Sequence, residues 1–312
     1  MVNKVNVIFV QATFGITTML EVVVYYIYIK KHYDVNFKAT PDFQAISKSR
    51  SAMVHEIAHV VFGNTDVLLL TYFCGLKMVS IYCVYNLIFS HLNQLMQSMT
   101  NGTNSALGQL MFENKSKYIK NYYTFEYLFQ CISCMVIVSA GAVTREFVSL
   151  YTIHARDINY MVSGVTELFV AIQILSLLRW PGMGAIKAAG LFKETQGRAL
   201  TEMSINLILS LILVKPFGIN GLLMGTIVAL LYRTVDVIFF TGKRILNDIG
   251  WRRSVRILLL MIFAGAVFAI EYQFPFEPVS YLYFALHGAA VLAVNAVLFI
   301  FFYLGTLRIK EG

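Results

Sequence analysis

The sequence predicts an all-α fold: a polytopic membrane helical bundle of about nine transmembrane helices. Three observations support this prediction. Hydrophobic residues make up 58% of the chain and charged residues 13%, with a mean hydropathy of +0.66, whereas about a quarter of the residues in soluble domains are charged. Apolar runs long enough to cross a hydrocarbon core of roughly 30 Å recur along the chain. Basic residues gather in every second connection between these runs.

The apolar runs define the expected elements in order. Residues 5–29 are mostly apolar and predict the first span. The second begins with the polar stretch Ser51–His59 and is clearly apolar only after Val60, so we expect one of its faces to lie against the bundle or a water-filled cavity. A short interfacial helix is expected after Pro41, and residues 99–121 form a second cytoplasmic segment. The nine predicted spans are residues 5–29, 52–73, 78–98, 122–144, 158–178, 199–214, 219–241, 255–271 and 279–306.

The sixth and seventh spans are predicted to form a helical hairpin. They are joined by the short turn Lys215–Asn220, which contains Pro216 and Gly218, and basic connections bracket the pair. The other connections are short as well, apart from the two cytoplasmic segments. Consecutive helices are therefore expected to be antiparallel neighbours, with no separate soluble domain.

The distribution of lysine and arginine predicts the orientation. Nineteen of these residues lie in one set of connections and five in the other, while Arg233 lies inside a span. Because cytoplasmic connections carry the excess of basic residues, the N-terminus is expected outside and the C-terminus in the cytoplasm. Membrane topology thus accounts for the net charge of +8, and nucleic acid is not an expected partner.

The four cysteines lie in or beside apolar runs. Cys131 and Cys134 have the spacing of half a zinc or redox motif, but no second pair accompanies them. We interpret them as small apolar packing residues. Neither a cofactor nor a bound metal is expected.

Ionisable residues inside the predicted spans are the first candidates for function, because a charge in the hydrocarbon core is costly. Arg233 and Asp236 are three residues apart on one helix face and can form an ion pair. That pair is either structural, or Arg233 lies on the wall of a central cavity. Asp66 and Glu126 are candidates for binding a coupling proton or sodium ion, and the sequence does not name the ion.

Residues 179–244 carry a series of short motifs that resemble a known family. The motifs are Arg-x-Pro, Ala-Gly-x-Phe-Lys-Glu-Thr, Ile-Asn-Leu, Phe-Gly-Ile-x-Gly, Gly-Thr and Leu-Tyr-Arg-x-x-Asp. This stretch resembles the C-terminal lobe of bacterial polysaccharide flippases of the Wzx type, which belong to the multidrug/oligosaccharidyl-lipid/polysaccharide exporter superfamily. Upstream, Asn64–Lys77 and Val79–Asn86 are similar to the first two helices of that lobe. The resemblance therefore covers about residues 50–245.

The resemblance implies three parts. Residues 1–50 correspond to the last helix of the N-terminal lobe and a cytoplasmic linker, residues 51–245 to one six-helix lobe of a MATE-like exporter, and residues 246–312 to an extra C-terminal helix pair. Compared with the family's two six-helix lobes, the first five helices are missing. We therefore expect a truncated chain that is inactive alone, unless two copies rebuild a two-lobed pore as a homodimer.

The implied activity is flipping of a polyprenyl-pyrophosphate-linked oligosaccharide, an O-antigen or exopolysaccharide repeat unit, across the bacterial plasma membrane. No bond is made or broken, so no catalytic residue and no enzyme activity are expected. The implied partners are that oligosaccharide, membrane lipid, a polysaccharide polymerase and glycosyltransferases. An anionic, hydroxyl-rich head group needs a wet, cationic cavity to cross a low-dielectric layer. Candidates to line the cavity are Asn64, Asp66, Tyr82, Tyr85, Asn86, Tyr127, Asn206 and Arg233.

Two alternatives stay open. One is a drug/cation exporter or lipid II exporter of the same superfamily, although Phe192–Thr195 and Leu231–Arg233 favour the polysaccharide branch. The other is an intramembrane zinc metalloprotease, because His55–His59 fits the pattern H-E-x-x-H, in which two imidazoles bind zinc and Glu56 acts as general base. Such proteases usually take a third ligand from an Asp-Gly dipeptide in another span, and the sequence contains none. Zinc content would separate the two classes.

Overall fold

The computed structural model describes residues 7–33, 43–155, 158–274, 276 and 280–307, and only the backbone of residues 7, 8, 10, 43–52, 55, 59 and 307. All regular elements in these ranges are helices, as the sequence predicts. They are α1 (Val7–His32), α2 (Phe43–Cys74), α3 (Leu76–Glu113), α4 (Lys115–Ala142), α5 (Thr144–Tyr151), α6 (Val165–Leu178), α7 (Trp180–Ala188), α8 (Phe192–Thr241), η1 (Gly242–Leu246), α9 (Trp251–Glu271) and α10 (Tyr281–Leu307). The chain divides into two compact units, residues 1–47 and 48–312.

The first unit contains α1, which coincides with the first predicted span. Its side chains from Gln11 to His32 are all exposed, and most of them are apolar. Thr13 and Thr17 donate their hydroxyls to carbonyls four residues earlier, at 2.8 and 2.9 Å. Such bonds satisfy a hydroxyl within its own helix. α1 is therefore suited to an apolar surrounding.

Seven helical segments of the described chain are long and apolar enough to cross a membrane. The protein is thus a multi-pass membrane protein by length and composition. The expected span 78–98 lies in α3, which is not among the seven, because polar residues such as Asn86, His91 and Asn93 interrupt its apolar run. A count of nine spans stays a prediction. The seven segments are Gln11–His32, Glu56–Cys74, Lys115–Ala142, Val165–Ala188, Phe192–Leu246, Trp251–Glu271 and Tyr281–Thr306.

α8 is a hairpin of two helical halves. Helical geometry breaks at Gly218, whose φ of 56° and ψ of −133° suit glycine and strain any residue with a Cβ. Asn206 Nδ2 donates to Thr226 Oγ1 at 2.9 Å, and Ser210 Oγ donates to Leu222 O at 3.3 Å, so the two halves face each other. A Cβ added at Gly225 would lie 2.6 Å from Ser210 Oγ, so this glycine permits the close approach. The predicted hairpin is present, with its turn inside Lys215–Asn220.

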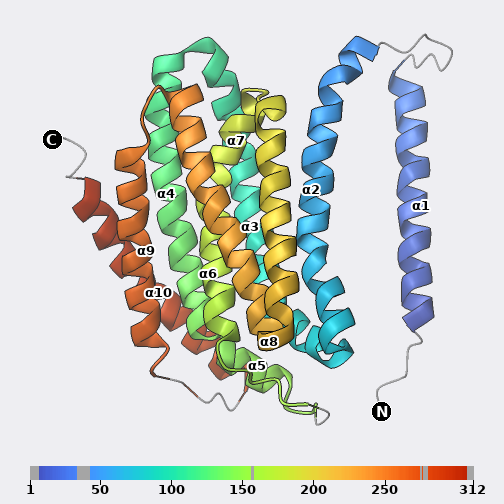
Figure 1. Ribbon diagram of the computed structural model, residues 1–312, viewed down its shortest axis with the longest axis vertical. Coiled ribbons are helices and arrows are strands. Elements are labelled where there is room, and N and C mark those ends of the chain that lie inside the picture. The colour runs from blue at the N-terminus through green and yellow to red at the C-terminus, as the bar shows by residue number, and fades with distance from the viewer. Residues whose placement is uncertain (1–6, 34–42, 156–157, 275, 277–279, 308–312) are drawn as a thin grey trace. The chain divides into compact units, whose positions relative to one another are not determined.

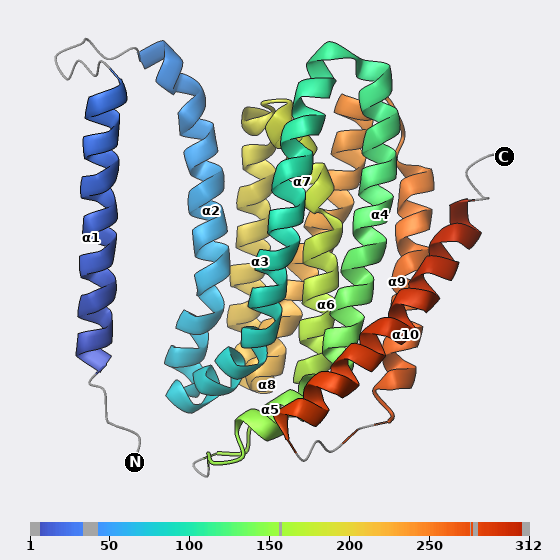
Figure 2. The same cartoon turned by 180° about the vertical axis from the view of Figure 1, so that it is seen from behind.

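α4 is the central helix of the second unit. It contacts α3, α6, α9 and α10, and α6 in turn packs along α8 (Figure 1). Figure 2 shows α10 crossing obliquely beside α4. Fully buried apolar side chains such as Ile137, Val138 and Leu177 form the core. Residues 246–312 therefore belong to the same compact unit as the rest of the bundle, and the three-part division of the chain stays a prediction.

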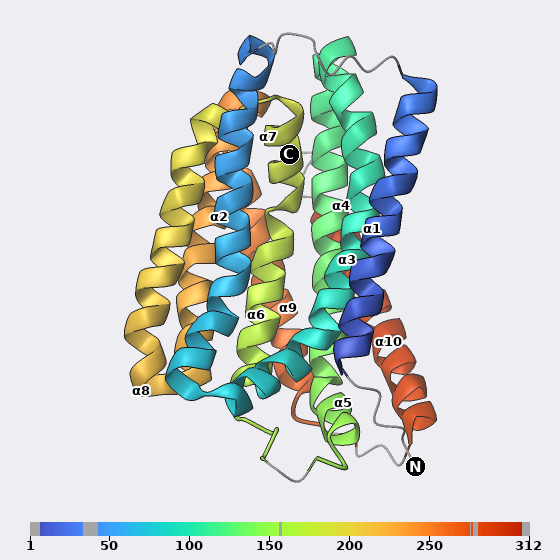
Figure 3. The ribbon, with the colours of Figure 1, turned by 90° about the vertical axis from the view of Figure 1, so that its right-hand side faces the viewer.

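The connections of the second unit gather at its two ends. The α2–α3 corner at Gly75, α5 and the α8 kink lie at one end, and the α3–α4 turn at Asn114 and the end of α7 lie at the other (Figures 1 and 3). This separation agrees with the alternation of sides predicted from the charges. Which end faces the cytoplasm stays a prediction.

Two predicted connections are helical. α2 runs without a break from Phe43 to Cys74, so the short helix expected after Pro41 is instead the start of α2. Residues 99–121 extend α3 and α4, which are separated at Asn114. Asn114 Oδ1 accepts from Lys117 N at 2.9 Å and so caps the start of α4.

Candidate functional site

Five charged side chains meet where α6, α7 and both halves of α8 pack together. We call Arg179, Arg198, Glu202, Arg233 and Asp236 the charge network. Arg233 lies at its centre with its side chain fully buried. Its Nη1 is 2.7 Å from Asp236 Oδ2, and its Nε is 3.4 Å from Glu202 Oε2 on the other half of the hairpin. The ion pair expected from the spacing of Arg233 and Asp236 is therefore part of a larger group.

Two outer arginines complete the charge network. Arg179 pairs with Glu202, and Arg198 pairs with Asp236. Three arginines thus face two carboxylates, which leaves one excess positive charge. The side chain of Arg198 is 42% exposed, whereas the other four are at most 12% exposed. Arg198 is therefore the most accessible cation of the charge network, and a role for Arg233 on a cavity wall stays a prediction.

A second group, the Asp66 cluster, joins α2, α3 and both halves of α8. It consists of Asp66, Tyr82, Asn206 and Thr226. Asp66 is 6% exposed, with Tyr82 Oη 3.4 Å from its Oδ2 and Thr226 Oγ1 3.4 and 3.5 Å from its Oδ1 and Oδ2. Asn206 is linked to Thr226 by the bond across the hairpin. The fold therefore brings together three predicted cavity residues and adds Thr226.

Three other predicted cavity residues lie elsewhere on α2 and α3. Tyr85 is buried, and its hydroxyl donates to Tyr160 O at 3.2 Å, which fixes the segment before α6. Asn86 is half-buried. Asn64 is exposed and donates to Val60 O of its own helix at 2.8 Å. Among the described contacts, none of the three hydrogen-bonds to the Asp66 cluster.

Glu126 belongs to a third group, the Glu126 cluster, formed by Tyr122, Glu126, Thr241, Arg253 and Arg256. Arg253 donates from Nε to Glu126 Oε2 at 2.8 Å and from Nη2 to Oε1. Tyr122 Oη donates to the same Oε1 at 3.1 Å. Glu126 and Arg253 are each 2% exposed. Because a buried cation already pairs with Glu126, the geometry favours a structural role over ion coupling.

Tyr127 lies in a packing contact between α4 and α10. Its hydroxyl hydrogen-bonds to Thr306, and its ring stacks on Tyr303 with the centroids 5.0 Å apart. The Arg256 guanidinium lies 4.3 Å from the centroid of the same ring. These contacts hold α10 against the bundle, so they favour packing over cavity lining for Tyr127.

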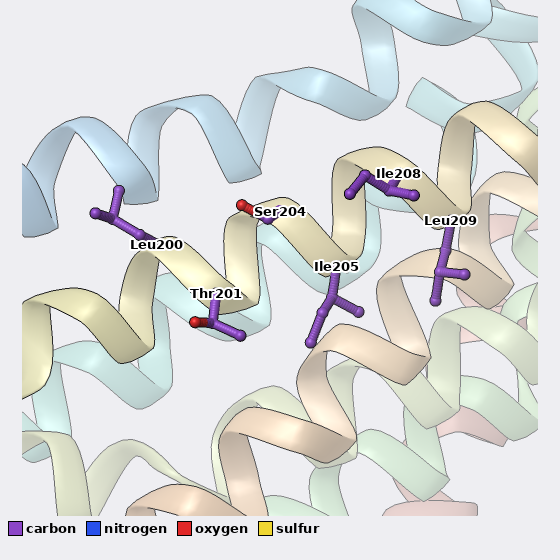
Figure 4. Close-up of a pocket in the computed structure, with 6 residues that line it drawn as sticks. All are labelled: Leu200, Thr201, Ser204, Ile205, Ile208 and Leu209. Carbon is purple, nitrogen blue, oxygen red and sulfur yellow. The ribbon is translucent and has the colours of Figure 1, made fainter.

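An open groove of about 430 Å³ follows the first half of α8. Figure 4 shows its six lining side chains along this one helical stretch. Arg198 is on the same half of α8, two residues before the first of the lining residues. Four of the six are apolar, which suits a hydrocarbon chain. They are Leu200, Thr201, Ser204, Ile205, Ile208 and Leu209.

Sequence reasoning missed several members of these groups. Glu202 lies inside a predicted span, and the criterion that selected Arg233 would also have selected it. Arg253 was assigned to a connection because the apolar run starts after it. Nothing in the sequence marks Thr226 as functional, because a threonine hydroxyl in a membrane helix can hydrogen-bond to a carbonyl of its own helix.

The structure describes only part of the metalloprotease motif. The backbone of His55–His59 lies in α2, but the side chains of His55 and His59 are outside the described residues. Among the described side chains, no group of three or more His, Cys, Asp or Glu could hold a metal ion.

Comparison with known proteins identifies no similar protein. No protein-family model, no curated protein and no solved structure matches the chain.

Proposed function

We propose that this protein takes part in moving a polyprenyl-pyrophosphate-linked oligosaccharide across a bacterial plasma membrane, as a membrane-embedded part of a polysaccharide flippase. The motifs in residues 179–244 support this proposal. The observation that carries it is the charge network, which places one excess positive charge within helices long and apolar enough to cross a membrane. Charged groups at such positions mark substrate pathways in membrane proteins.

A pyrophosphate group fits the chemistry of the charge network. Arginine binds phosphate oxygens through two parallel hydrogen bonds, and these bonds are strong where little water is present. Asp236 pairs with both Arg198 and Arg233, so an incoming pyrophosphate would compete with this carboxylate for the two arginines. Such an exchange lets the network bind and release an anion without leaving an arginine unpaired in the membrane.

The groove accounts for the other end of the substrate. Its lining starts two residues after Arg198 on the same half of α8, so a lipid whose phosphate lies at Arg198 can place its tail along Leu200, Ile205 and Ile208. A polyprenyl chain is apolar throughout and gains by this contact. Charge and apolar surface are thus adjacent in the order that a polyprenyl pyrophosphate requires.

The excess positive charge also bears on the alternatives. A network with more arginines than carboxylates disfavours a cationic drug as substrate. Lipid II carries the same pyrophosphate, so only the sugar would distinguish it from a polysaccharide repeat unit. The metalloprotease alternative depends on His55 and His59, which the charge network does not involve.

Binding of polyprenyl pyrophosphate to the purified chain in detergent tests the proposal. Neutral polyprenol of the same length is the ligand control. We expect the pyrophosphate to bind at least about tenfold more tightly, since a charge-assisted hydrogen bond contributes about 1.5–3 kcal/mol. Arg198→Ala should remove most of this difference. Arg244→Ala is the matched control, because Arg244 is exposed and is not in the charge network. Equal binding of the two lipids, or equal loss in the two variants, would contradict the proposal.

Transport is then measured in vesicles containing the protein and a fluorescent polyprenyl-pyrophosphate oligosaccharide. A membrane-impermeant quencher reports the fraction of the lipid in the outer leaflet. Exchange between leaflets that Arg198→Ala slows and Arg244→Ala leaves unchanged would indicate that two copies of the chain form a transport-competent homodimer, whereas no exchange would agree with the expectation that the chain is inactive alone. Lipid II, offered as a competitor, tests the sugar specificity.

A further inference from the structure

The start of α9 holds three arginines that share one carboxylate. Its first two turns contain Arg252, Arg253 and Arg256. Arg253 bonds to both oxygens of Glu126, whereas Arg256 Nη2 lies 3.9 Å from Glu126 Oε2, which is beyond hydrogen-bond distance. Arg252 is exposed and forms no ion pair with a described side chain. Among the described residues, Arg252 and Arg256 therefore have no hydrogen-bonded counter-ion.

The carboxylate that precedes the helix does not change this count. Asp248 accepts a hydrogen bond from Tyr123 Oη at 3.2 Å. It forms no ion pair with the arginines of α9 among the described contacts. The positive charge of Arg252 and Arg256 is thus left for a group outside the described chain.

Arg252 and Arg256 lie on one face of α9, because residues four apart are neighbours on a helix. They are separated by about 6 Å along the helix axis. The Tyr127 ring covers one side of the Arg256 guanidinium, at 4.3 Å from its centroid, and Arg256 Nε and Nη2 are buried without a hydrogen-bond partner among the described atoms. The side chain is still 19% exposed. Two arginines at this spacing suit a single phosphate group, which each can bind through its planar fork of donors.

The surface around the two arginines is apolar. Apart from Arg252, every exposed side chain of α9 is apolar, and the helix is one of the membrane-crossing segments. Val255 and Leu259 are exposed on the same face as the arginines, three and seven residues after Arg252. Trp251, directly before Arg252, is 67% exposed, and tryptophan is enriched where a membrane meets water. The arginines therefore lie at the polar end of a lipid-facing surface.

We propose that the start of α9 is a binding site for an anionic phospholipid of the surrounding bilayer, with its phosphate held by Arg252 and Arg256 and an acyl chain along Val255 and Leu259. Charge identifies the occupant. A zwitterionic lipid brings its own cation, whereas an anionic lipid neutralises the arginines, and each basic residue near a membrane surface strengthens the attraction about fivefold. The site shares no residue with the charge network and does not depend on the proposed function.

Trp251 provides a reporter beside the site. The chain contains two tryptophans, so Trp180→Phe leaves Trp251 as the only one. Brominated lipids quench the fluorescence of a tryptophan that they contact. The purified full-length Trp180→Phe chain is placed in phosphatidylcholine micelles that contain increasing fractions of brominated phosphatidylglycerol or brominated phosphatidylcholine. We expect the phosphatidylglycerol to reach half-maximal quenching at a fraction at least about tenfold lower, because two arginines attract it.

Substitutions of exposed arginines separate a site from a general surface charge. Arg252→Gln should reduce the preference for phosphatidylglycerol about fivefold, and Arg252→Lys should retain most of it because the charge remains. Arg244→Gln is the matched control, since Arg244 is an exposed arginine of η1 outside α9, and it should leave the preference unchanged. If Trp180→Phe does not fold, the difference between wild type and Trp251→Phe gives the same signal.

Two competitors identify the ligand. Sodium phosphate, compared with sodium chloride at equal ionic strength, should not displace the brominated phosphatidylglycerol, because a free phosphate lacks the acyl chain. Polyprenyl pyrophosphate should compete no better than unbrominated phosphatidylglycerol, and stronger competition would assign the site to the transported lipid instead. Equal quenching by the two brominated lipids, an equal loss in Arg252→Gln and Arg244→Gln, or displacement by free phosphate would overturn the proposal.

Discussion

Replacing Arg253 with methionine should strongly destabilise the second unit, because it leaves Glu126 buried without its main partner. Arg253 makes two bonds to Glu126 and also donates to Ile238 O at 3.1 Å and Thr241 Oγ1 at 3.2 Å. Removing one partner of a buried ion pair typically destabilises a protein by about 3–5 kcal/mol. The four bonds of Arg253 join α4, α9 and the end of α8, so the loss affects the whole bundle.

Two residues lower the expected magnitude. Arg256 Nη2 lies 3.9 Å from Glu126 Oε2, and Tyr122 Oη already donates to Oε1 at 3.1 Å. Both would stabilise the carboxylate after Arg253 is removed. We therefore expect a loss of about 3 kcal/mol, which is roughly a 100-fold change in the unfolding equilibrium.

Reversible unfolding in mixed detergent, followed by tryptophan fluorescence, measures this change. Arg252→Met is the matched control, since Arg252 is the exposed neighbour on the same helix, and it should lie within about 0.5 kcal/mol of wild type. The double variant Glu126→Gln/Arg253→Met removes both charges and should recover most of the loss, because uncharged replacements of a buried ion pair are often neutral. Equal effects of Arg253→Met and Arg252→Met, or strict additivity in the double variant, would refute the reasoning.

Two further predictions concern topology and hairpin packing. Single cysteines introduced at Arg252 and Gln273 of a cysteine-free chain test the orientation by labelling with an impermeant thiol reagent in intact cells. We expect Gln273→Cys to react and Arg252→Cys to be protected. The reverse labelling pattern would show that the orientation is opposite to the predicted one. Gly225→Ala should destabilise the protein by about 1–3 kcal/mol, because its Cβ would meet Ser210 at 2.6 Å. In the control Gly102→Ala the added Cβ meets no atom within 4 Å, so thermal unfolding should show no loss of stability. A loss of stability equal to that of Gly225→Ala would argue against tight packing of the hairpin.

The hairpin was predictable because its determinants are local. Pro216 and Gly218 interrupt two apolar runs, and the turn lies between them. The helical extension through residues 99–113 was not predictable in the same way, because its asparagines and glycines are typical of loops. In the fold, α3 packs against α7 there, and a Cβ at Gly108 would lie only 3.7 Å from Ala188 Cβ. Tertiary contact thus overrides the local preference.

The functional groups show the same limit. The pairing of Arg233 with Asp236 follows from a spacing of three residues, whereas its pairing with Glu202 exists only because the hairpin closes. Asp66 and Thr226 are 160 residues apart in sequence. The sequence identified ionisable residues in apolar runs, but only the fold determines which of them are neutralised by a partner.

The pairing across the α8 hairpin has a consequence for how the chain enters the bilayer during synthesis. A charged residue at the centre of a lone helix opposes insertion by about 2.5–3.5 kcal/mol. Glu202 lies on the first half of the hairpin and Arg233 on the second. Their ion pair can therefore form only when both halves are present. The same holds for Asn206 and Thr226. The two halves should therefore leave the insertion machinery together, and the short turn at Gly218 keeps them close enough to do so.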